Sequence, residues 1–467
     1  MKINSRKGLS FLFLLFTQVV ALIVLNGTTS IPGSGFHYLC LLPLTYGLLM
    51  YFTNMKYGVF RYLGITIMNM ILFVRYVISP LYSSITNTYY HSGSIRTDDF
   101  TNTVSIALMI LEMMSIFLVF HFGIRKLLPL RDKLSIYHKK KSGNTSVYNV
   151  AILIGVLSFL IFPGIRANTN FLIAKDFDGG NFNTIAGIGL IFTQISLQAL
   201  LVVTAIRQFR RKLKREKVNK ALILFVTLLQ ISVFWNTSRL NVLANGIIAT
   251  SFLNHLKLIS KTSINIIIAL SVISVISITA LTDVGQGSVG NFQGAVAGQY
   301  GNNNQQTNDY FQAYFGGSSL IATTIAIEPK VSNSLNVLTF LNEIASSILF
   351  VRQVFPASDN FTTTQFNYVF GYKGGNSMIL PTLGQSYLYF GFWGSSLLSI
   401  AFSLLLLWGE KKVIQSKTIG EKYAFIVLLV WVAFFPMQNL NIISATFFNV
   451  FLTFFLLSKL NRKIKIQ

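Results

Sequence analysis

The sequence predicts an all-α polytopic membrane protein, and three features of its composition lead to this fold class. Of the 467 residues, 52% are hydrophobic and only 11% are charged, whereas about a quarter of the residues in soluble domains are charged. The mean hydropathy is +0.58, and apolar stretches recur that could cross a hydrocarbon core of about 30 Å. This composition excludes a water-soluble enzyme, a disordered chain and, with Cys40 as the one cysteine, a disulfide scaffold.

About twelve transmembrane helices are predicted from stretches of roughly 20 apolar residues. In chain order they cover 9–26, 36–52, 59–82, 102–122, 147–163, 185–206, 220–235, 239–256, 263–281, 388–408, 423–438 and 441–458. The first stretch follows three cations but lacks a small-x-small cleavage site, so we interpret it as a retained signal anchor. With the N-terminus in the cytoplasm, this number of spans also predicts a cytoplasmic C-terminus.

The formal net charge of +24 could indicate a nucleic-acid-binding protein, but the positions of the cations give another explanation. Of the 38 Lys and Arg residues, 30 fall on the predicted cytoplasmic side, many of them in the run 207–215. Nine of the 14 Asp and Glu residues fall on the outer side. This distribution is the positive-inside bias of membrane proteins. We therefore expect membrane lipid as a partner and no nucleic acid.

One extracytoplasmic loop is much longer than the others, and it divides the chain into three parts. Residues 1–281 hold helices one to nine, residues 282–387 form the large loop, and residues 388–467 hold helices ten to twelve with a basic cytoplasmic tail. The loop begins with a Gly/Asn/Gln-rich stretch, 285–309, which is predicted to be irregular or mobile. In 335–351, polar and apolar residues fall on opposite helical faces, which predicts an amphipathic helix at the membrane surface.

Motifs of soluble enzymes are absent from the sequence. There is no Walker loop, HExxH, CxxC or GxSxG motif. Of the five histidines, only His37 and His91 lie near the predicted outer face, and neither belongs to a cluster. We therefore expect no metal site and no cofactor.

Arg75 and Glu112 fall well inside predicted spans, where an unpaired charge costs several kcal/mol. Arg75 lies about two turns below the outer end of the third span, and Glu112 lies about ten residues below that of the fourth. At 1.5 Å per residue their depths differ by roughly 5 Å, which two long side chains can bridge. A pair that only fixes helix packing and a pair with a catalytic role are both consistent with this placement.

Further cations lie on the outer side, against the charge bias. Those near the predicted membrane level are Arg166, Arg239, Arg352 and Lys373. Several arginines at one level suit a lipid pyrophosphate, because the guanidinium fork matches phosphate oxygens. Snorkelling of each side chain to lipid headgroups is the alternative.

Candidate acids and aromatic residues lie in the large loop. Glu343 is on the polar stripe of the predicted amphipathic helix, which makes it a candidate for orienting or deprotonating a hydroxyl group. Among the tyrosines, Tyr314, Tyr372 and Tyr387 could stack against sugars, and they could equally form an interfacial belt.

Four segments carry a resemblance to a known family. They are Arg75–Pro80, Ser238–Leu240, Tyr314–Gly317 and Pro381–Gly394, the last with an aromatic followed by Phe-Gly-x-x-Gly. With the span pattern and the large loop, these segments resemble the Wzy-type polymerases, which join the oligosaccharide repeat units of bacterial surface polysaccharides such as O-antigen, capsule and exopolysaccharide.

The resemblance implies a membrane glycosyltransferase in the bacterial cytoplasmic membrane. Such a protein transfers a growing chain from undecaprenyl pyrophosphate onto an incoming lipid-linked repeat unit at the outer face. It needs no metal or nucleotide sugar, and a chain-length regulator protein is a candidate partner. We expect Arg75, Arg166, Arg239, Arg352 and Lys373 to hold pyrophosphate. Glu112 or Glu343 would then activate the acceptor, with Arg75 at the reaction centre.

Three other functions are compatible with a helical membrane protein of this size. A flippase for the same lipid-linked oligosaccharide would have loops of similar short length, unlike 282–387. A polysaccharide ligase would carry a functional histidine in its large loop, and 282–387 contains none. A small-solute transporter would need more than two buried charges to define an ion path.

Overall fold

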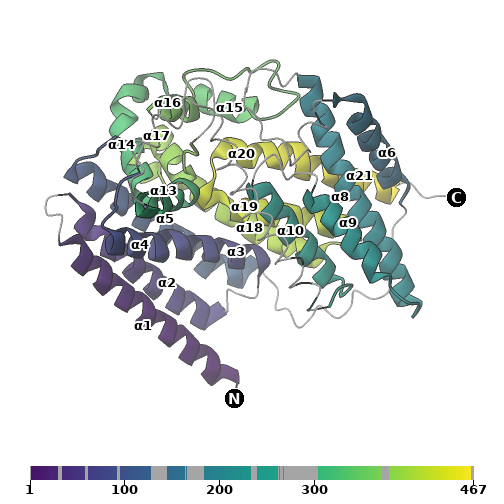
Figure 1. Ribbon diagram of the computed structural model, residues 1–467, viewed down its shortest axis with the longest axis horizontal. Coiled ribbons are helices and arrows are strands. Elements are labelled where there is room, and N and C mark those ends of the chain that lie inside the picture. The colour runs from purple at the N-terminus through teal and green to yellow at the C-terminus, as the bar shows by residue number, and fades with distance from the viewer. Residues whose placement is uncertain are drawn as a thin grey trace. The chain divides into compact units, whose positions relative to one another are not determined.

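In a computed structural model, every regular element among the described residues is a helix (Figure 1). This confirms the all-α class for that part of the chain. The described residues are 2–29, 34–57, 62–91, 95–127, 145–163, 165, 184–232, 239–260, 262, 264, 267, 303–369 and 378–463. The predicted ninth span, 263–281, lies almost wholly outside them.

The chain forms two compact units that each combine distant parts of the sequence. The first consists of Met1–Pro129, Ala297–Glu410 and Val432–Ser444. The second consists of Leu130–Val296, Lys411–Trp431 and Ala445–Gln467.

The first unit contains most of the helices that matter for the candidate site. They are α1 (Lys2–Thr28), η1 (Phe36–Cys40), α2 (Leu41–Tyr57), α3 (Leu63–Phe73), η3 (Val74–Ile78), α4 (Ser79–Thr86), α5 (Asp99–Leu127), α13 (Asn303–Phe315), α14 (Ser318–Val331), η6 (Ser332–Ser334), α15 (Val337–Ser346), α16 (Thr362–Val369), α17 (Thr382–Gly394), most of α18 (Leu397–Gln415), η7 (Phe435–Met437) and α20 (Leu440–Ala445). Within this unit α5 packs against α2 and α14, and α14 also packs against α17. The loop helices α13 to α16 are thus part of the same body as the first spans.

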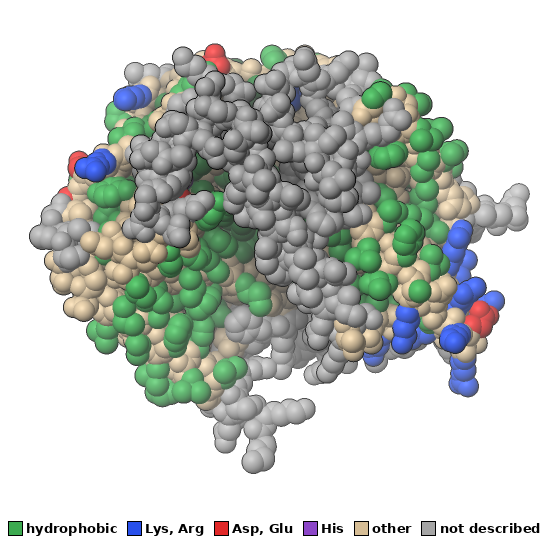
Figure 2. Space-filling view, viewed as in Figure 1, with side chains coloured by type: hydrophobic (Ala, Val, Ile, Leu, Met, Phe, Trp, Pro, Cys, Tyr) green, Lys and Arg blue, Asp and Glu red, His purple; other side chains and the backbone are tan. Residues whose placement is uncertain are grey.

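The second unit is built around paired helices. They are α6 (Ser146–Ile161), α8 (Thr184–Leu213), α9 (Lys220–Ser232), α10 (Arg239–His255), most of α19 (Ile419–Ala433), η8 (Thr446–Leu452) and α21 (Thr453–Lys463). The helix α8 packs against α6 and α9, and α21 packs against α6. Figure 2 shows Lys and Arg side chains gathered at the lower right, where α8 ends and α9 begins. This basic surface includes the cytoplasmic run that the sequence predicts.

Six helical stretches among the described residues are long and apolar enough to cross a membrane. They are Gly8–Thr28, Phe36–Asn54, Leu63–Thr86, Asp99–Lys126, Gly187–Leu213 and Leu440–Arg462. The pair α17 and α18 adds a seventh if it counts as one span, and α6 and α9 are shorter apolar helices. Several helices therefore identify a multi-pass membrane protein, while the count of twelve and the N-in topology stay predictions.

The predicted tenth span, 388–408, is interrupted by a sharp bend rather than forming a straight helix. Helix α17 begins at Thr382, inside the predicted loop, and α18 turns away from it by 108°. The bend follows Gly391, whose φ of 69° and ψ of −171° interrupt the helix. This backbone region is essentially restricted to glycine, so the break depends on the absence of a Cβ atom.

We expect Gly391→Ala to destabilise the protein by about 1–3 kcal/mol, because alanine is strained in this conformation. No atom lies within 4 Å of the position that a Cβ would occupy, so the cost comes from the backbone alone. Gly8→Ala is the matched control: Gly8 lies inside α1 and also has open space around it. Thermal unfolding in nanodiscs measures both variants, and equal melting temperatures would contradict the prediction.

The predicted irregular stretch 285–309 is wrong at its C-terminal end, because α13 begins at Asn303. Asn308 accepts a hydrogen bond from Ser83 and donates one to the carbonyl oxygen of Tyr90. Gln305 also donates to that oxygen and to Asp309, which is only 4% exposed. These partners satisfy buried polar groups that composition alone assigns to solvent.

An amphipathic helix is present where the sequence predicts one, although it is shorter than 335–351. Helix α15 begins after Asn336, whose side chain accepts a hydrogen bond from the backbone N–H of Thr339 and caps the helix. Its apolar side chains Val337 and Leu338 are 71% and 65% exposed, while Glu343 is fully buried. The apolar face is therefore free to contact lipid and the polar face turns toward the protein.

Candidate functional site

The predicted pair of ionisable residues is formed within the first unit. The Nη1 atom of Arg75 lies 3.0 Å from Oε2 of Glu112, and both side chains are completely buried. Glu112 also accepts hydrogen bonds from the hydroxyls of Tyr76, at 2.7 Å, and Ser399, at 2.9 Å. Arg75 donates to the carbonyl oxygen of Pro436 at 2.9 Å. The pair thus joins η3 and α5 to α18 and η7.

Arg75 and Tyr76 lie in a π-helical stretch, η3, that interrupts the helix from Leu63 to Thr86. Such stretches are rare and occur often at functional sites. The Nε and Nη2 atoms of Arg75 are buried and have no hydrogen-bond partner among the described residues. A buried donor without a partner costs about 1–3 kcal/mol, so the unsatisfied N–H bonds on these two atoms are unusual for a buried side chain.

A second buried carboxylate, Glu343, is held by donors rather than by a cation. The backbone N–H groups of Thr362 and Thr363, at the start of α16, point at it from 3.3 and 3.2 Å. The hydroxyls of both threonines donate to it as well, each at 2.8 Å at closest. The N–H groups at the start of α16 and these hydroxyls thus provide hydrogen-bond donors to both oxygens of the buried carboxylate.

Two further residues complete the surroundings of Glu343. The hydroxyl of Tyr389 donates to Oε2 from 2.5 Å, and the side-chain amide of Asn441 donates to Oε1 from 3.4 Å. Tyr389 comes from α17 and is partly exposed, whereas the carboxylate itself is not. Tyr389 is therefore the member of this group through which a proton could pass between the carboxylate and a bound molecule.

The segment 434–439, which contains η7, lies between α19 and α20 and connects the surroundings of Glu112 and Glu343 within the first unit. At one end the carbonyl of Pro436 binds Arg75. The hydroxyl of Thr382, the first residue of α17, donates to the carbonyl of Phe435 at 2.8 Å. The residues of η7 are themselves buried, so these side-chain donors satisfy carbonyl groups that solvent cannot reach.

The other end of this segment is fixed by Gln385 of α17. Its carbonyl oxygen accepts a hydrogen bond from the backbone N–H of Leu440 at 2.8 Å, and its amide donates to Asn441 at 3.4 Å. Asn441 in turn contacts Glu343. Hydrogen bonds and the backbone between them therefore connect Arg75 with Glu343 inside the first unit, and the bonds of Asn441 are partly buried.

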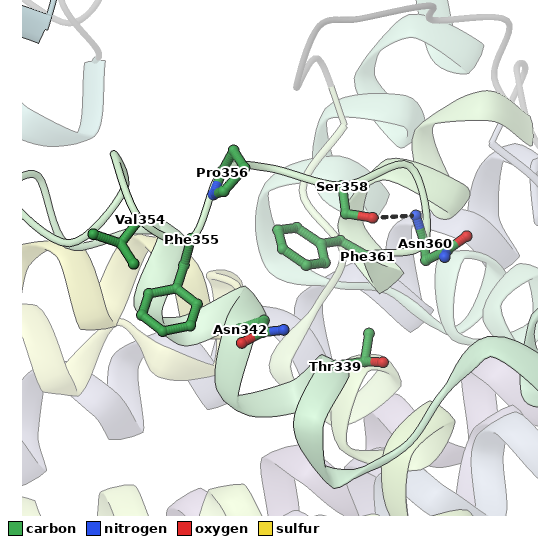
Figure 3. A pocket seen from close by; sticks show the side chains of 8 residues that line it. All are labelled: Thr339, Asn342, Val354, Phe355, Pro356, Ser358, Asn360 and Phe361. Carbon is green, nitrogen blue, oxygen red and sulfur yellow. Dashed lines mark hydrogen bonds between the residues drawn. The ribbon is translucent and has the colours of Figure 1, made fainter.

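A cavity of about 300 Å³ lies beside α15. Its lining residues are Thr339, Asn342, Val354, Phe355, Pro356, Ser358, Asn360 and Phe361. Figure 3 shows that Thr339 and Asn342 come from the helix, while the other six come from the segment that leads to α16. One wall of the cavity is thus α15, which carries Glu343, and the other is the segment that leads into α16.

The remaining predicted site residues are distributed differently. Arg352 follows α15 in the first unit and is exposed, whereas Arg239 begins α10 in the second unit. Tyr314 is 37% exposed and Tyr387 is partly buried. Arg166, Lys373 and Tyr372 lie outside the described residues. The structure therefore joins Arg75 with Glu112 directly, and its described contacts bring no second predicted cation to that pair.

Sequence reasoning did not single out the residues that hold Glu343. Thr362 and Thr363 lie in an ordinary polar run, and Asn441 is more than 90 residues away from Glu343 in the chain. Tyr389 was one of several tyrosines near the end of the large loop. Tyr389 lies seven residues after Thr382, so the two side chains fall on the same face of α17. This helical spacing is the signal that could have predicted that Tyr389 faces the protein interior, as Thr382 does.

A titratable histidine lies near the end of α4, outside the spanning helices. Burial lowers the pKa of His91 below its usual 6.5, and the Asp309 carboxylate opposes this shift. Because the unfolded chain then binds the proton more readily, stability is present above pH 6.5 and is lost as the pH falls. We expect thermal unfolding in nanodiscs to show lower stability at pH 5 than at pH 7.5. The difference should shrink in His91→Gln, and an unchanged difference would contradict the assignment.

The fold defines a helical multi-pass membrane protein, and its first unit holds the completely buried carboxylates Glu112 and Glu343 described above. No protein-family model, curated protein or solved structure matches the chain. Among the described residues, no group of three or more His, Cys, Asp or Glu side chains could hold a metal ion.

Proposed function

We propose that this protein is a polymerase that joins oligosaccharide repeat units carried on undecaprenyl pyrophosphate, at the outer face of a bacterial cytoplasmic membrane. The observation that carries the proposal is the Tyr389–Glu343 pair. It combines a completely buried carboxylate on α15 with a partly exposed phenol on α17, and Asn342, the residue before Glu343, lines the cavity. Glycosyl transfer to a hydroxyl group is aided by a side chain that takes up the proton of that hydroxyl group.

The proposed reaction forms one glycosidic bond. A hydroxyl oxygen of the incoming repeat unit attacks the anomeric carbon of the growing chain, and the bond from that carbon to the lipid pyrophosphate breaks. The pyrophosphate leaves with the electron pair. The hydroxyl proton passes to the oxygen of Tyr389 while the proton of Tyr389 passes to Glu343, which ends as a carboxylic acid.

The donors around Glu343 hold its carboxylate in place for this role, but they also prevent it from contacting the sugar directly. The carboxylate accepts from Thr362, Thr363, Tyr389 and Asn441, so its lone pairs are largely occupied and it has no exposed surface. Direct contact with a sugar would require the removal of one donor. Transfer through Tyr389 avoids this cost, since the hydrogen bond between the two groups is already formed.

The leaving pyrophosphate needs cations at the same membrane level. In this proposal the exposed Arg352 binds it first, because the chain continues from Arg352 directly into the wall of the cavity. Arg75 supplies two further donors, Nε and Nη2, which are buried without partners among the described residues. The cations Arg166, Arg239 and Lys373 remain candidates for the second lipid pyrophosphate.

A deletion strain of the organism that encodes the chain tests the proposed function. Its lipid-linked and surface glycans are separated by size, and the leaflet of the lipid-linked units is determined with a membrane-impermeant glycosidase. The proposal predicts single repeat units on the outer leaflet and no long polymer, with polymer restored by the wild-type gene. Repeat units confined to the cytoplasmic leaflet would instead identify a flippase. Polymer that is made but not attached to its final carrier would identify a ligase.

A further inference from the structure

The cavity beside α15 has a lining that selects for one kind of ligand. It is bounded by two phenylalanine rings, Phe355 and Phe361, and by hydroxyl and amide groups, and no charged residue lines it. Its volume of about 300 Å³ is at the small end of ligand pockets. We propose that this cavity is a subsite for one neutral sugar ring of the oligosaccharide.

Free hydrogen-bonding capacity in the cavity comes from residues on both walls. The side-chain amides of Asn342 and Asn360 have no hydrogen-bond partner among the described residues. The hydroxyl of Ser358 accepts a bond from the backbone N–H of Asn360, as Figure 3 shows, and keeps its own proton to donate. Paired donors and acceptors without charge match the alternating hydroxyl groups of a sugar.

The aromatic residues account for the apolar side of such a ligand. Phe361 is only 4% exposed and forms a rigid wall, whereas Phe355 is 40% exposed and lies nearer the opening. The C–H face of a sugar ring packs on aromatic rings in the same way as other apolar groups do. A fatty chain would leave the amides of Asn342 and Asn360 unpaired, and that penalty argues against lipid tails as the occupant.

The absence of a lining cation separates this cavity from the pyrophosphate site. Arg352 lies two residues before Val354, so a charged group can bind at the rim while a neutral ring occupies the interior. The residues next to the cavity in sequence, Glu343 and Thr362, belong to the proposed proton-transfer group. A ring held here would contact α15, which carries Glu343, and the segment 354–361, which leads into α16.

This inference depends on the proposed function only for the identity of the sugar-bearing molecule. Its test uses the full-length protein in nanodiscs and saturation-transfer NMR. The probe is the oligosaccharide released by mild acid from the cell's own lipid-linked repeat units. Asn342→Leu keeps the side-chain size and removes the hydrogen bonds, and Phe355→Ala removes the exposed ring. Gln353→Leu makes the same kind of change at an exposed amide that does not line the cavity.

We expect the wild-type protein and Gln353→Leu to bind the oligosaccharide equally. Asn342→Leu and Phe355→Ala should each raise its Kd about ten-fold, as the loss of one or two good contacts does. Equal binding by all four proteins would overturn the proposal. So would competition by inorganic pyrophosphate, which would indicate an anion site.

Failure of the subsite and failure of the proposed function have different results. If the deletion strain lacks polymer but Asn342→Leu binds and polymerises like the wild type, the subsite is wrong and the function stands. If the deletion strain makes normal polymer while sugar binding still depends on Asn342, the function is wrong and the subsite stands.

Discussion

Cells whose only copy of the protein carries Glu343→Gln should accumulate single repeat units and make almost no long polymer. Loss of a general base typically costs about 10²–10⁴-fold in rate. Glutamine cannot take up the proton, and its amide would place N–H donors against the hydroxyls of Thr362 and Thr363. The measurement is the size profile of surface glycan at matched protein level.

Two further variants separate a chemical role of Glu343 from a purely structural one. Tyr389→Phe keeps the carboxylate and its other donors but removes the proposed proton path, so it should fold normally and still lose most activity. Glu328→Gln is the matched control, a loop carboxylate on α14 that is outside this group. Full polymer from Tyr389→Phe would contradict the proton-transfer role.

Arg75→Ala should destabilise the protein by about 3–5 kcal/mol, because it leaves the buried charge of Glu112 without its partner. The replacement of both residues, Arg75→Met with Glu112→Leu, should restore most of this loss, since an apolar pair of similar volume avoids the desolvation of two charges. The recovery should be incomplete, because Tyr76 and Ser399 lose their acceptor. Thermal unfolding in nanodiscs compares the three proteins.

The double variant also decides between the structural and the catalytic interpretation of the pair. If Arg75 supplies donors to pyrophosphate, the double variant is folded but makes no polymer. Wild-type polymer length from a stable double variant would show that Arg75 and Glu112 only fix helix packing.

The sequence predicts helices well wherever apolar length or helical periodicity is strong. The first four spans lie near their predicted positions, because a stretch of about 20 apolar residues in lipid can satisfy its backbone hydrogen bonds only as a helix. The amphipathic α15 also lies near its predicted position, because its polar and apolar residues alternate with helical periodicity. The pair of Arg75 and Glu112 was also predictable, since helix rise converts chain position into depth.

Other features depend on contacts that are distant in the chain. The helix at Asn303–Phe315 forms in an Asn-rich stretch because its side chains find partners on the segment around Tyr90. The break at Gly391 is set by one backbone conformation, which no periodicity reports. The donors that surround Glu343 come from three elements, α16, α17 and α20. They come together only when these helices pack, so no local sequence pattern predicts the group.

Reconstitution of the purified protein tests the central claim most directly. Lipid-linked single repeat units are extracted from the deletion strain, mixed with the protein in nanodiscs without nucleotide sugar and with a chelator of divalent cations, and the products are separated by size. The account predicts a ladder of lengths that grows with time, with release of undecaprenyl pyrophosphate, and no ladder with Glu343→Gln. Repeat units that remain single with the folded wild-type protein would contradict it.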